Sequence, residues 1–307
     1  MDNIIINADS MEHLKTLDDN IFDSCVTDPP YHLASIVKRF KNGPQAKYGK
    51  DGSFQRLSTG FMGEEWDGGD IAFQKEFWQQ VYRVLKPKSV VLAFAATRNY
   101  HRMAVAIEDA GFEIFDMINW IYGTGFPKGK NLLKPGHEPI VMARKGVNKH
   151  LNIDECRIPY ADENDRSGWH TTGSDGTKGY MGTDTFKIRK ISAEELTERT
   201  KDGRYPANVI HDGEDLRYFY CAKASKKEKG DSGHPTVKPL ELMKYLVRLI
   251  TPKDGIVLDP FAGTGTTGEA AILEGRKYYL IEKTDKYMEY IEKRINKYNK
   301  FRNWKDR

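Results

Sequence analysis

Short apolar runs alternate with amphipathic stretches along most of this chain of 307 residues. Such alternation predicts strands and helices in turn, and therefore an α/β fold with a mostly parallel sheet. Ligands of open α/β sheets bind beyond the carboxyl ends of the strands, so the residues that follow each strand are the candidates for chemistry. We expect strands at residues 4–6, 24–27, 90–94, 113–121, 140–143, 256–258 and 277–282. The strands at 113–121 and 140–143 are expected to form a late antiparallel hairpin. We expect helices at 73–85, 100–110, 240–250 and 266–273, with a first helix reaching residue 17 and a last one reaching residue 298.

A glycine-rich turn, DPFAGTG at residues 259–265, follows one of the predicted strands and leads into a helix. Gly263 and Gly265 permit a tight turn and a close approach of the backbone to a ligand at the helix N-terminus. Glu282 ends the next predicted strand, where its carboxylate can accept hydrogen bonds from both hydroxyls of a ribose. With Gly268 the two glycines also match G-x-G-x-x-G, so a dinucleotide-dependent oxidoreductase is an alternative. No Lys-Ser or Lys-Thr pair follows them, which argues against a P-loop.

A second turn, Asp28-Pro29-Pro30-Tyr31, follows the second predicted strand. The two prolines fix the backbone and remove two amide donors, which leaves carbonyl oxygens free as acceptors in a rigid turn. The Asp28 carboxylate and the Pro29 carbonyl can bind both hydrogens of an aromatic amine such as adenine N6. Binding of this kind would localise the nitrogen lone pair for attack on a methyl group. Tyr31 offers a flat face on which a base drawn out of the duplex can stack.

The two turns together resemble the motifs of the β-group amino-methyltransferases of DNA, in which the catalytic motif precedes the cofactor motif. The resemblance extends over most of the chain. Ser89 stands where this family usually has a glycine, a departure that we interpret as harmless. The other segments that carry the resemblance are 7–9 (NAD), 84–94 (VLKPKSVVLAF), 134–140 (KPGHEPI, with its Glu before an apolar run), 204–211 (RYPANVIH, as in phage-type and prophage-type members) and 234–240 (HPTVKPL).

This resemblance implies a Rossmann-like methyltransferase sheet with a circularly permuted motif order and S-adenosyl-L-methionine as the cofactor. It implies that the turn at 28–31 is catalytic, that Asp9 contacts the adenine of the cofactor, and that the segment around Lys238 helps to hold its methionine part. Asp rather than Ser before Pro-Pro-Tyr favours adenine over cytosine as the target. The full set of expected cofactor-binding residues is Asp9, Lys238, Asp259, Phe261, Ala262, Gly263, Thr264, Gly265, Thr266 and Glu282.

Residues 148–232 do not continue the alternation of strands and helices, being polar, rich in turns and mixed in charge. We therefore expect 1–147 to be the catalytic half of a methyltransferase domain and 233–307 its cofactor-binding half. The segment 148–232 between them is then an insert for recognition of the target sequence. The alternative for this insert is a contact between two subunits, which would make the protein a homodimer.

The distribution of charge adds a candidate DNA contact. The formal net charge of +4 permits nucleic-acid binding without showing it. Between residues 35 and 56, however, six basic residues stand against one acidic residue, directly after the turn at 28–31. We expect this segment to contact the phosphates of double-stranded DNA, and a solvated surface loop is the alternative. The residues expected to do so are Lys38, Arg39, Lys41 and Lys47.

The three cysteines, Cys25, Cys156 and Cys221, are scattered and suggest neither a metal site nor a disulfide framework. Cys25 is expected in the core of a strand, and no Pro-Cys loop supplies the thiolate that methylation of cytosine C5 requires. The histidines lack zinc spacing, so no metal is expected. No signal peptide and no apolar run of membrane-spanning length is visible, which predicts a cytoplasmic protein of a bacterial or phage-infected cell.

The sequence thus predicts an S-adenosylmethionine-dependent DNA methyltransferase, of restriction–modification or phage type, that modifies adenine N6 of a flipped base. An N4-cytosine enzyme is the first alternative, because the rule on Asp before Pro-Pro-Tyr has exceptions. An oxidoreductase would leave the turn at 28–31 unexplained, and a non-catalytic DNA-binding module would leave both motifs without a use. The recognition sequence and any restriction partner do not follow from the sequence.

Overall fold

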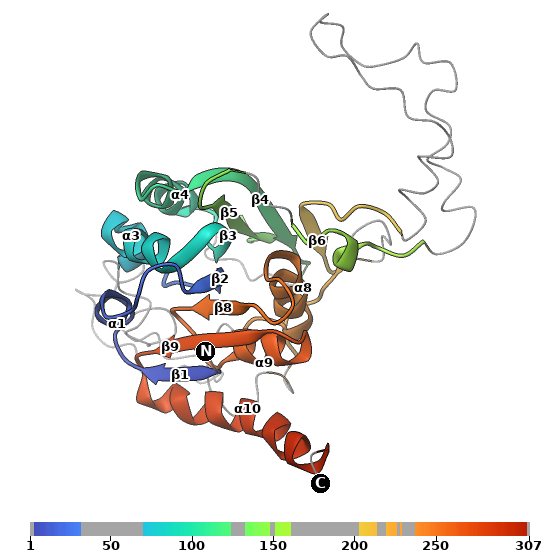
Figure 1. The fold of residues 1–307 in the computed structure, drawn as a ribbon. Helices are drawn as coiled ribbons and strands as arrows, with labels where there is room; N and C mark the ends of the chain where they lie inside the picture. Colours follow the sequence, from blue (N-terminus) through green and yellow to red (C-terminus); the bar gives the residue numbers. More distant parts are fainter. Residues whose placement is uncertain are drawn as a thin grey trace, which may run out of the picture.

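The protein is described here from a computed structural model, which describes residues 3–31, 70–123, 133–147, 151–160, 203–213, 219–225, 228 and 237–305. These residues form a nine-stranded sheet in the order β1-β9-β8-β2-β3-β5-β4-β6-β7 (Figure 1). Six of the eight neighbouring pairs are parallel, and only β5 runs antiparallel to both of its neighbours within the described residues. The predicted α/β class, with a mostly parallel sheet and a late antiparallel hairpin, is confirmed.

The strands of this sheet are β1 (Ile4–Asn7), β2 (Phe22–Thr27), β3 (Leu85–Phe94), β4 (Glu113–Ile121), β5 (His137–Arg144), β6 (Val209–His211), β7 (Phe219–Tyr220), β8 (Ile256–Asp259) and β9 (Lys277–Glu282). The α-helices are α1 (Ser10–Lys15), α3 (Lys75–Val84), α4 (Tyr100–Asp109), α8 (Leu240–Ile250), α9 (Thr266–Leu273) and α10 (Asp285–Lys305), and two short 3-10 helices are η3 (Ile71–Phe73) and η4 (Asp154–Cys156).

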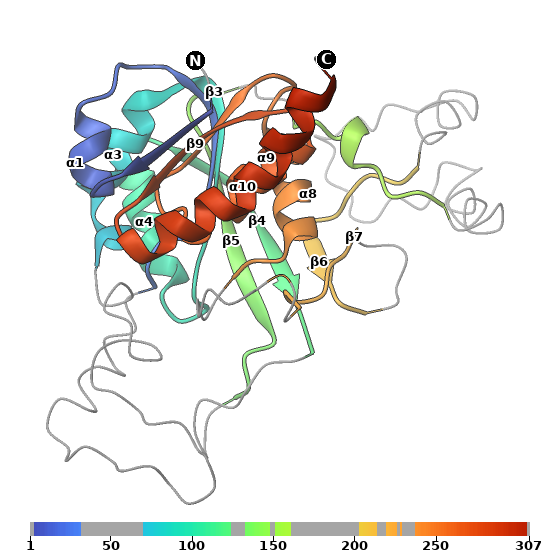
Figure 2. The same ribbon diagram turned by 90° about the horizontal axis from the view of Figure 1, so that it is seen from below.

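The central strands are buried on both faces, which explains their nearly continuous apolar sequences. Side chains of β3 alternate between two cores. Val90 and Leu92 pack in one core with residues of α8, α9 and α10, whereas Val91 and Ala93 pack in the other with residues of α1, α3 and α4. Figure 2 shows α1 and α3 on one side of the strands and α8 on the other. Cys25 lies in the second core, as predicted.

The parallel part of the sheet brings the carboxyl ends of five strands to one edge. Strands β1, β9, β8, β2 and β3 follow each other in this order, and each pair of neighbours is parallel. The residues that follow them are therefore neighbours in space although they are far apart in the sequence. This edge is where an open α/β sheet binds its ligands.

Several elements differ from their predicted bounds. Strand β3 begins at Leu85 rather than at residue 90, and β5 begins at His137 rather than at residue 140. The helix predicted at 73–85 ends at Val84, and Leu85 already belongs to β3. Pro87 explains this early end, because a residue that precedes proline disfavours the helical backbone. The last helix, α10, continues to Lys305 rather than to residue 298.

Two short strands, β6 and β7, come from the segment that the alternation pattern left without strands. Strand β6 pairs in parallel with β4, and β7 pairs in parallel with β6, at the end of the sheet. Strands of two or three residues are too short to produce a periodic pattern, so the sequence could not indicate them. No helix in the described ranges is long and apolar enough to cross a membrane.

Candidate active site

The two predicted turns meet because β2 and β8 are neighbouring strands, in which Ser24 pairs with Val257 and Cys25 with Leu258. Asp259, the last residue of β8, joins the turns chemically. Its carboxylate accepts hydrogen bonds from Thr27 Oγ1 at 2.8 Å and from Thr267 Oγ1 at 2.5 Å.

The carboxyl group of Asp259 is only 3% exposed. Burial raises its pKa to about 6, although the hydrogen bonds from the two threonine hydroxyls act in the opposite direction. The buried position and the short hydrogen bonds assign Asp259 a structural role, in which it fixes the glycine-rich turn to the end of β2.

The glycine-rich turn needs glycine at two positions for steric reasons. Gly265, at the N-terminus of α9, has a left-handed backbone with φ of 78°, and a Cβ atom there would lie 3.1 Å from Ile291 of α10. Gly268 packs against β9, since a Cβ atom would lie 2.7 Å from Leu280. The third glycine of the pattern thus serves close packing of helix on strand rather than ligand contact.

Glu282 lies beside this turn at the end of β9. One oxygen of its carboxylate accepts a hydrogen bond from the amide of Gly263 and the other from the amide of Thr284, each at 2.8 Å. A carboxylate oxygen has a second lone pair, so Glu282 can hold the turn and still accept hydrogen bonds from ligand hydroxyls.

Asp9 lies at the same edge, because β1 pairs with β9 and Asn7 is opposite Glu282. Its carboxylate caps α1 by accepting from the amides of Met11 and Glu12 at 3.0 and 3.2 Å, and it forms an ion pair with Lys283 at 3.0 Å. Burial alone would raise the pKa of Asp9, but Lys283 and the capping amides lower it.

Asp28 lies on the other side of Asp259, in a cluster of polar side chains. Its carboxylate is within 2.6 Å of the Lys238 ammonium and accepts a hydrogen bond from the Tyr31 hydroxyl at 2.7 Å. Glu138 of β5 completes the cluster, with its carboxylate 3.2 Å from Lys238 Nζ and 3.4 Å from the Tyr31 hydroxyl. Tyr122 donates a hydrogen bond to the other oxygen of Glu138 at 3.3 Å.

The protonation of this cluster follows from burial and from its charges. Burial raises the pKa of Asp28, and the charge of Glu138 acts in the same direction against the opposing effect of Lys238. Burial alone would lower the pKa of Lys238, but the two carboxylates outweigh it and raise that pKa. The pKa of Tyr31 is raised well above its ordinary value by burial and by both carboxylates, so its hydroxyl remains a donor.

Sequence reasoning missed the contribution of three residues to this cluster. Glu138 and Tyr122 were given no role, although Glu138 lies in a segment singled out by its resemblance. Asn99, which precedes α4, donates a hydrogen bond to the carbonyl of Tyr31 at 2.6 Å and so fixes the end of the turn at 28–31. Only the folded chain brings these residues together, because they come from β5, the end of β4 and the start of α4.

Lys238 was expected among the cofactor-binding residues, and the structure places its ammonium against Asp28 and Glu138. The predicted DNA contacts Lys38, Arg39, Lys41 and Lys47 lie outside the described residues. No cluster of His, Cys, Asp and Glu that could hold a metal ion occurs in the described part of the chain.

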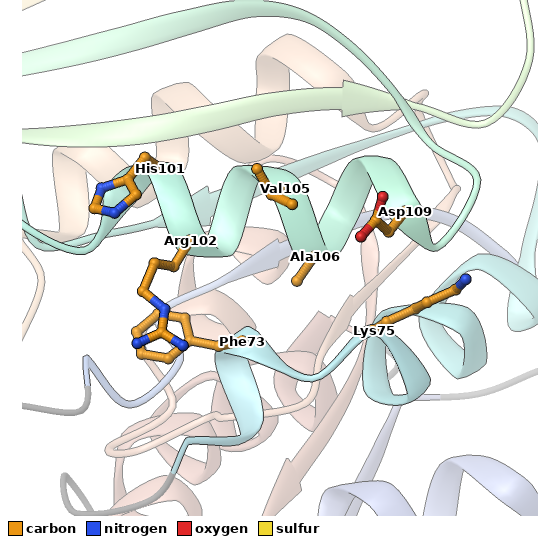
Figure 3. A pocket seen from close by; sticks show the side chains of 7 residues that line it. All are labelled: Phe73, Lys75, His101, Arg102, Val105, Ala106 and Asp109. Carbon is orange, nitrogen blue, oxygen red and sulfur yellow. The ribbon is translucent and has the colours of Figure 1, made fainter.

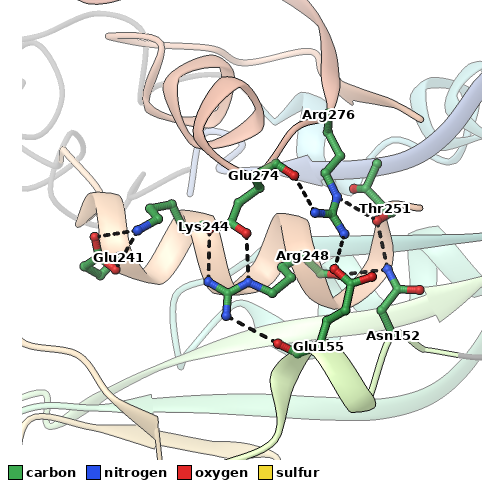
Figure 4. A network of polar contacts seen from close by, with 8 residues as sticks. All are labelled: Asn152, Glu155, Glu241, Lys244, Arg248, Thr251, Glu274 and Arg276. Atoms are coloured by element: carbon green, nitrogen blue, oxygen red, sulfur yellow. Dashed lines mark hydrogen bonds and ion pairs between the residues drawn. The ribbon is translucent and has the colours of Figure 1, made fainter. Parts of the chain in front are cut away.

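A polar network fixes residues 152–155 to α8 and to the connection between α9 and β9 (Figure 4). Arg276 donates to Glu155 at 2.8 Å, and Arg248 of α8 forms a two-pronged ion pair with Glu274 at 2.8 and 3.0 Å. Asn152 donates to the carbonyls of Arg248 and Thr251, both at 2.8 Å. Residues 152–155 are therefore held close to the end of α8.

A separate cavity of about 280 Å³ lies along α4 and η3 (Figure 3). None of the predicted site residues lines it. We therefore place the active site at the edge of the sheet and not in this cavity. The residues that line it are Phe73, Lys75, His101, Arg102, Val105, Ala106 and Asp109.

The DNA methylase family that modifies amino groups at N6 or N4 matches residues 22–293 of this chain, which include both turns and the strands that carry them. The chain belongs to this family. It is thus a DNA methyltransferase that uses S-adenosylmethionine and acts on adenine N6 or cytosine N4. The predicted class of enzyme and its cofactor are confirmed.

Curated relatives of this chain include type II methyltransferases of bacteria. M.HindIII of Haemophilus influenzae is 27% identical, over 92% of this chain and 91% of the relative. M2.LlaDCHI of Lactococcus lactis subsp. cremoris is 24% identical, over 96% of this chain and 89% of the relative.

Solved structures share the fold. The complex of M1.HpyAVI with SAM has a TM-score of 0.53 at 20% identity and covers 95% of this chain and 98% of its own. The PvuII cytosine-N4-specific DNA methyltransferase has a TM-score of 0.57 at 15% identity, over 96% and 86% of the two chains.

Proposed function

We propose that this protein methylates N6 of an adenine flipped out of double-stranded DNA, with the turn at 28–31 as its catalytic motif. The observation that carries the proposal is the junction of this turn with the glycine-rich turn, through the hydrogen bond from Thr27 to Asp259 at 2.8 Å. A reacting amine on one turn and a methyl donor on the other would then be neighbours.

In this proposal Asp28 and the carbonyl of Pro29 accept the two hydrogens of N6. S-adenosylmethionine held at the glycine-rich turn would supply its methyl group to the amine lone pair, which is no longer delocalised into the ring, and the electron pair of the carbon–sulfur bond would go to sulfur. The methylated nitrogen then carries a positive charge and loses one proton. We assign Asp28 as the acceptor of that proton, because burial and Glu138 raise its pKa.

Tyr31 has two roles in the proposal. Its ring offers a stacking face to the flipped base, and stacking of this kind is worth about 1–3 kcal/mol. Its hydroxyl, held as a donor, fixes one oxygen of Asp28 so that the carboxylate points in one direction. Pro30 keeps the turn rigid.

The residues at the edge of the sheet fit the cofactor chemically. S-adenosylmethionine supplies an electrophilic methyl group on a positively charged sulfur. We assign Glu282 to its ribose hydroxyls and Asp9 to its adenine, with Gly263 and Gly265 allowing close approach of the backbone. The remaining members of the proposed pocket are Lys238, Asp259, Phe261, Ala262, Thr264 and Thr266.

The order of the motifs supports assignment to the permuted β group, since β2 with its DPPY turn precedes β8 with its glycine-rich turn in the chain. We propose in addition that 148–232 recognises the target sequence within a domain formed by 1–147 and 233–307. We further propose that the protein serves restriction–modification or a phage in a bacterial cytoplasm, and that it acts either as a monomer or as a homodimer.

The test is expression in a bacterial host that lacks DNA methylation, followed by sequencing of the host DNA for modified bases. The proposal predicts N6-methyladenine at one short recognition sequence, and a much smaller modified fraction of these sites with the Asp28→Ala variant. Modified cytosine at such a sequence would overturn the choice of adenine, and unmodified DNA in the presence of folded protein would overturn the proposed function.

A further inference from the structure

We propose that Lys238 occupies, in the protein without DNA, the place on Asp28 that the target amine takes, and that Glu138 is the positioning residue that receives Lys238 when the amine arrives. This inference rests on the proposed function of Asp28 as acceptor for the amine. It assigns Glu138, on β5, a part in the reaction.

The ammonium of Lys238 contacts both carboxylates at once and also donates to the Tyr31 hydroxyl at 3.2 Å, with Asp28 as its nearer partner. Its ammonium is 2.6 Å from Oδ2 of Asp28 and 3.2 Å from Oε2 of Glu138. Its side chain is only 7% exposed, whereas both carboxylates retain 21% exposure. An ammonium so deeply buried cannot leave Asp28 for bulk water without a large desolvation cost, so a second carboxylate within reach is needed.

The charges of the cluster favour this exchange. Two carboxylates surround one ammonium, so the cluster carries one negative charge in excess when all three groups are ionised. When Lys238 pairs with Glu138, that excess negative charge lies on Asp28. A positive charge develops on the attacking nitrogen in the reaction, and an unpaired Asp28 stabilises it better than one already neutralised by lysine.

Tyr31 and Tyr122 prepare both carboxylates for the exchange. The Tyr31 hydroxyl lies 2.7 Å from Asp28 and 3.4 Å from Glu138, so it bridges the two acceptors. Tyr122 holds the far oxygen of Glu138 at 3.3 Å, which keeps the near oxygen directed at Lys238. The ammonium also lies 4.7 Å from the centre of the Phe94 ring, a contact that persists with either partner.

A purely structural role of Glu138 makes different predictions. If Glu138 only balanced the charge of Lys238, its replacement would change stability and would leave the recognition of the amine unchanged. The exchange instead predicts that Glu138→Gln leaves Lys238 on Asp28, where it competes with the amine. The matched control is Glu113→Gln. This substitution also removes a carboxylate from a strand, but Glu113 forms its ion pair with Arg144 and does not belong to this cluster.

The first experiment measures single-turnover methyl transfer to unmethylated plasmid DNA as a function of pH. We expect Glu138→Gln to reduce the maximal rate about 10- to 100-fold, at or below the low end of the roughly 10²–10⁴-fold contributed by a group that itself transfers the proton, with unchanged affinity for S-adenosylmethionine. Glu138→Asp, which keeps the charge, should recover part of the rate. The Glu113→Gln control should match the wild type.

The pH at which the rate falls on the acidic side of the profile (the acid limb) distinguishes a positioning role of Glu138 from a purely structural one. The groups that face Asp28 are Tyr31, Lys238, Glu138 and Asp259. Asp28 accepts the amine only when ionised, so activity falls as the pH drops through its pKa. Because the charge of Glu138 raises that pKa, Glu138→Gln should move the acid limb to lower pH, whereas Glu138→Asp should leave it in place.

The second experiment needs no turnover. It compares binding of two duplexes that contain the methylated sequence found in host DNA, one with adenine and one with purine, which lacks the amine, at the target. Because purine is paired more weakly and is flipped at a lower cost, the quantity compared between variants is the ratio of the two affinities. Relative to Glu113→Gln, Glu138→Gln should shift this ratio several-fold toward the purine duplex. A Glu138→Gln variant with the rate, acid limb and affinity ratio of Glu113→Gln would overturn the inference. A wild type that transfers no methyl group would instead overturn the proposed function.

Discussion

Replacement of Asp28 by Ala should reduce the rate of methyl transfer without disturbing the fold or the cofactor site. The reason is that Asp28 lies in the polar cluster and not in the glycine-rich turn. The substitution removes the carboxylate of Asp28, which directly follows β2, whereas the hydrogen bonds of Thr27 and Thr267 to Asp259 remain. We therefore expect the affinity for S-adenosylmethionine to change little. The rate of methyl transfer should fall by about 10²–10³, which corresponds to about 2.7–4 kcal/mol of lost transition-state stabilisation.

The effect on stability follows from what remains around Lys238. Removal of one partner of a buried ion pair costs about 3–5 kcal/mol when the remaining charge has no other partner. Lys238 keeps Glu138 at 3.2 Å, so the free energy of unfolding should decrease by only about 1–2 kcal/mol. Asp28→Asn, which keeps the shape but not the charge, is the matched control and should lose nearly as much activity.

The assay is single-turnover transfer of a labelled methyl group, with calorimetry of cofactor binding and a urea titration on the same preparations. If Asp28→Ala kept near-normal turnover, Asp28 would not be the acceptor. If it lost cofactor binding instead, the assignment of Asp28 to the chemistry and not to the cofactor pocket would be wrong.

Further predictions concern the cofactor pocket, the fold and the DNA contact. Glu282→Ala should weaken S-adenosylmethionine binding measured by calorimetry about 10-fold or more, because a charge-assisted hydrogen bond is lost, and unchanged affinity would argue against its assignment to the ribose. Arg276→Ala should lower the free energy of unfolding by about 1–3 kcal/mol in a urea titration, because the buried side chain loses its hydrogen bonds to Glu155 and to the carbonyl of Thr251, and an unchanged free energy of unfolding would contradict this role in the network. Joint neutralisation of Lys38, Arg39 and Lys41 should weaken DNA binding and flatten its dependence on salt, whereas an unchanged slope would exclude these residues from phosphate contact.

Much of the sheet could be predicted because its strands are long enough to carry a pattern. The apolar runs of β8 and β9 and the glycines between them indicate a strand, a turn and a helix from local sequence alone. That β2 and β8 lie side by side could not be predicted in this way, because about 230 residues separate the two strands and no local pattern specifies their pairing. Their pairing in the folded sheet establishes that they are neighbours.

The polar cluster around Asp28 could be predicted only in part from the sequence. Asp28 stands out because two prolines and a tyrosine follow it, whereas Glu138 is one of many glutamates in a charged chain. Its importance arises from the pairing of β5 with β3, which places it opposite Lys238 and Tyr31. Contacts between side chains from separate connections depend on the tertiary fold, and no spacing within one segment predicts them.

The most direct test of the central claim is analysis of the methylated product made by purified protein. Unmethylated duplex DNA is incubated with S-adenosylmethionine that carries an isotopic label in its methyl group, and the DNA is then digested to nucleosides and separated by chromatography with mass detection. The account predicts that the label appears in N6-methyladenine and that Asp28→Ala abolishes at least 99% of it at early times, as expected for about a 10²-fold loss. Label in N4-methylcytosine, or equal labelling by Asp28→Ala, would contradict it.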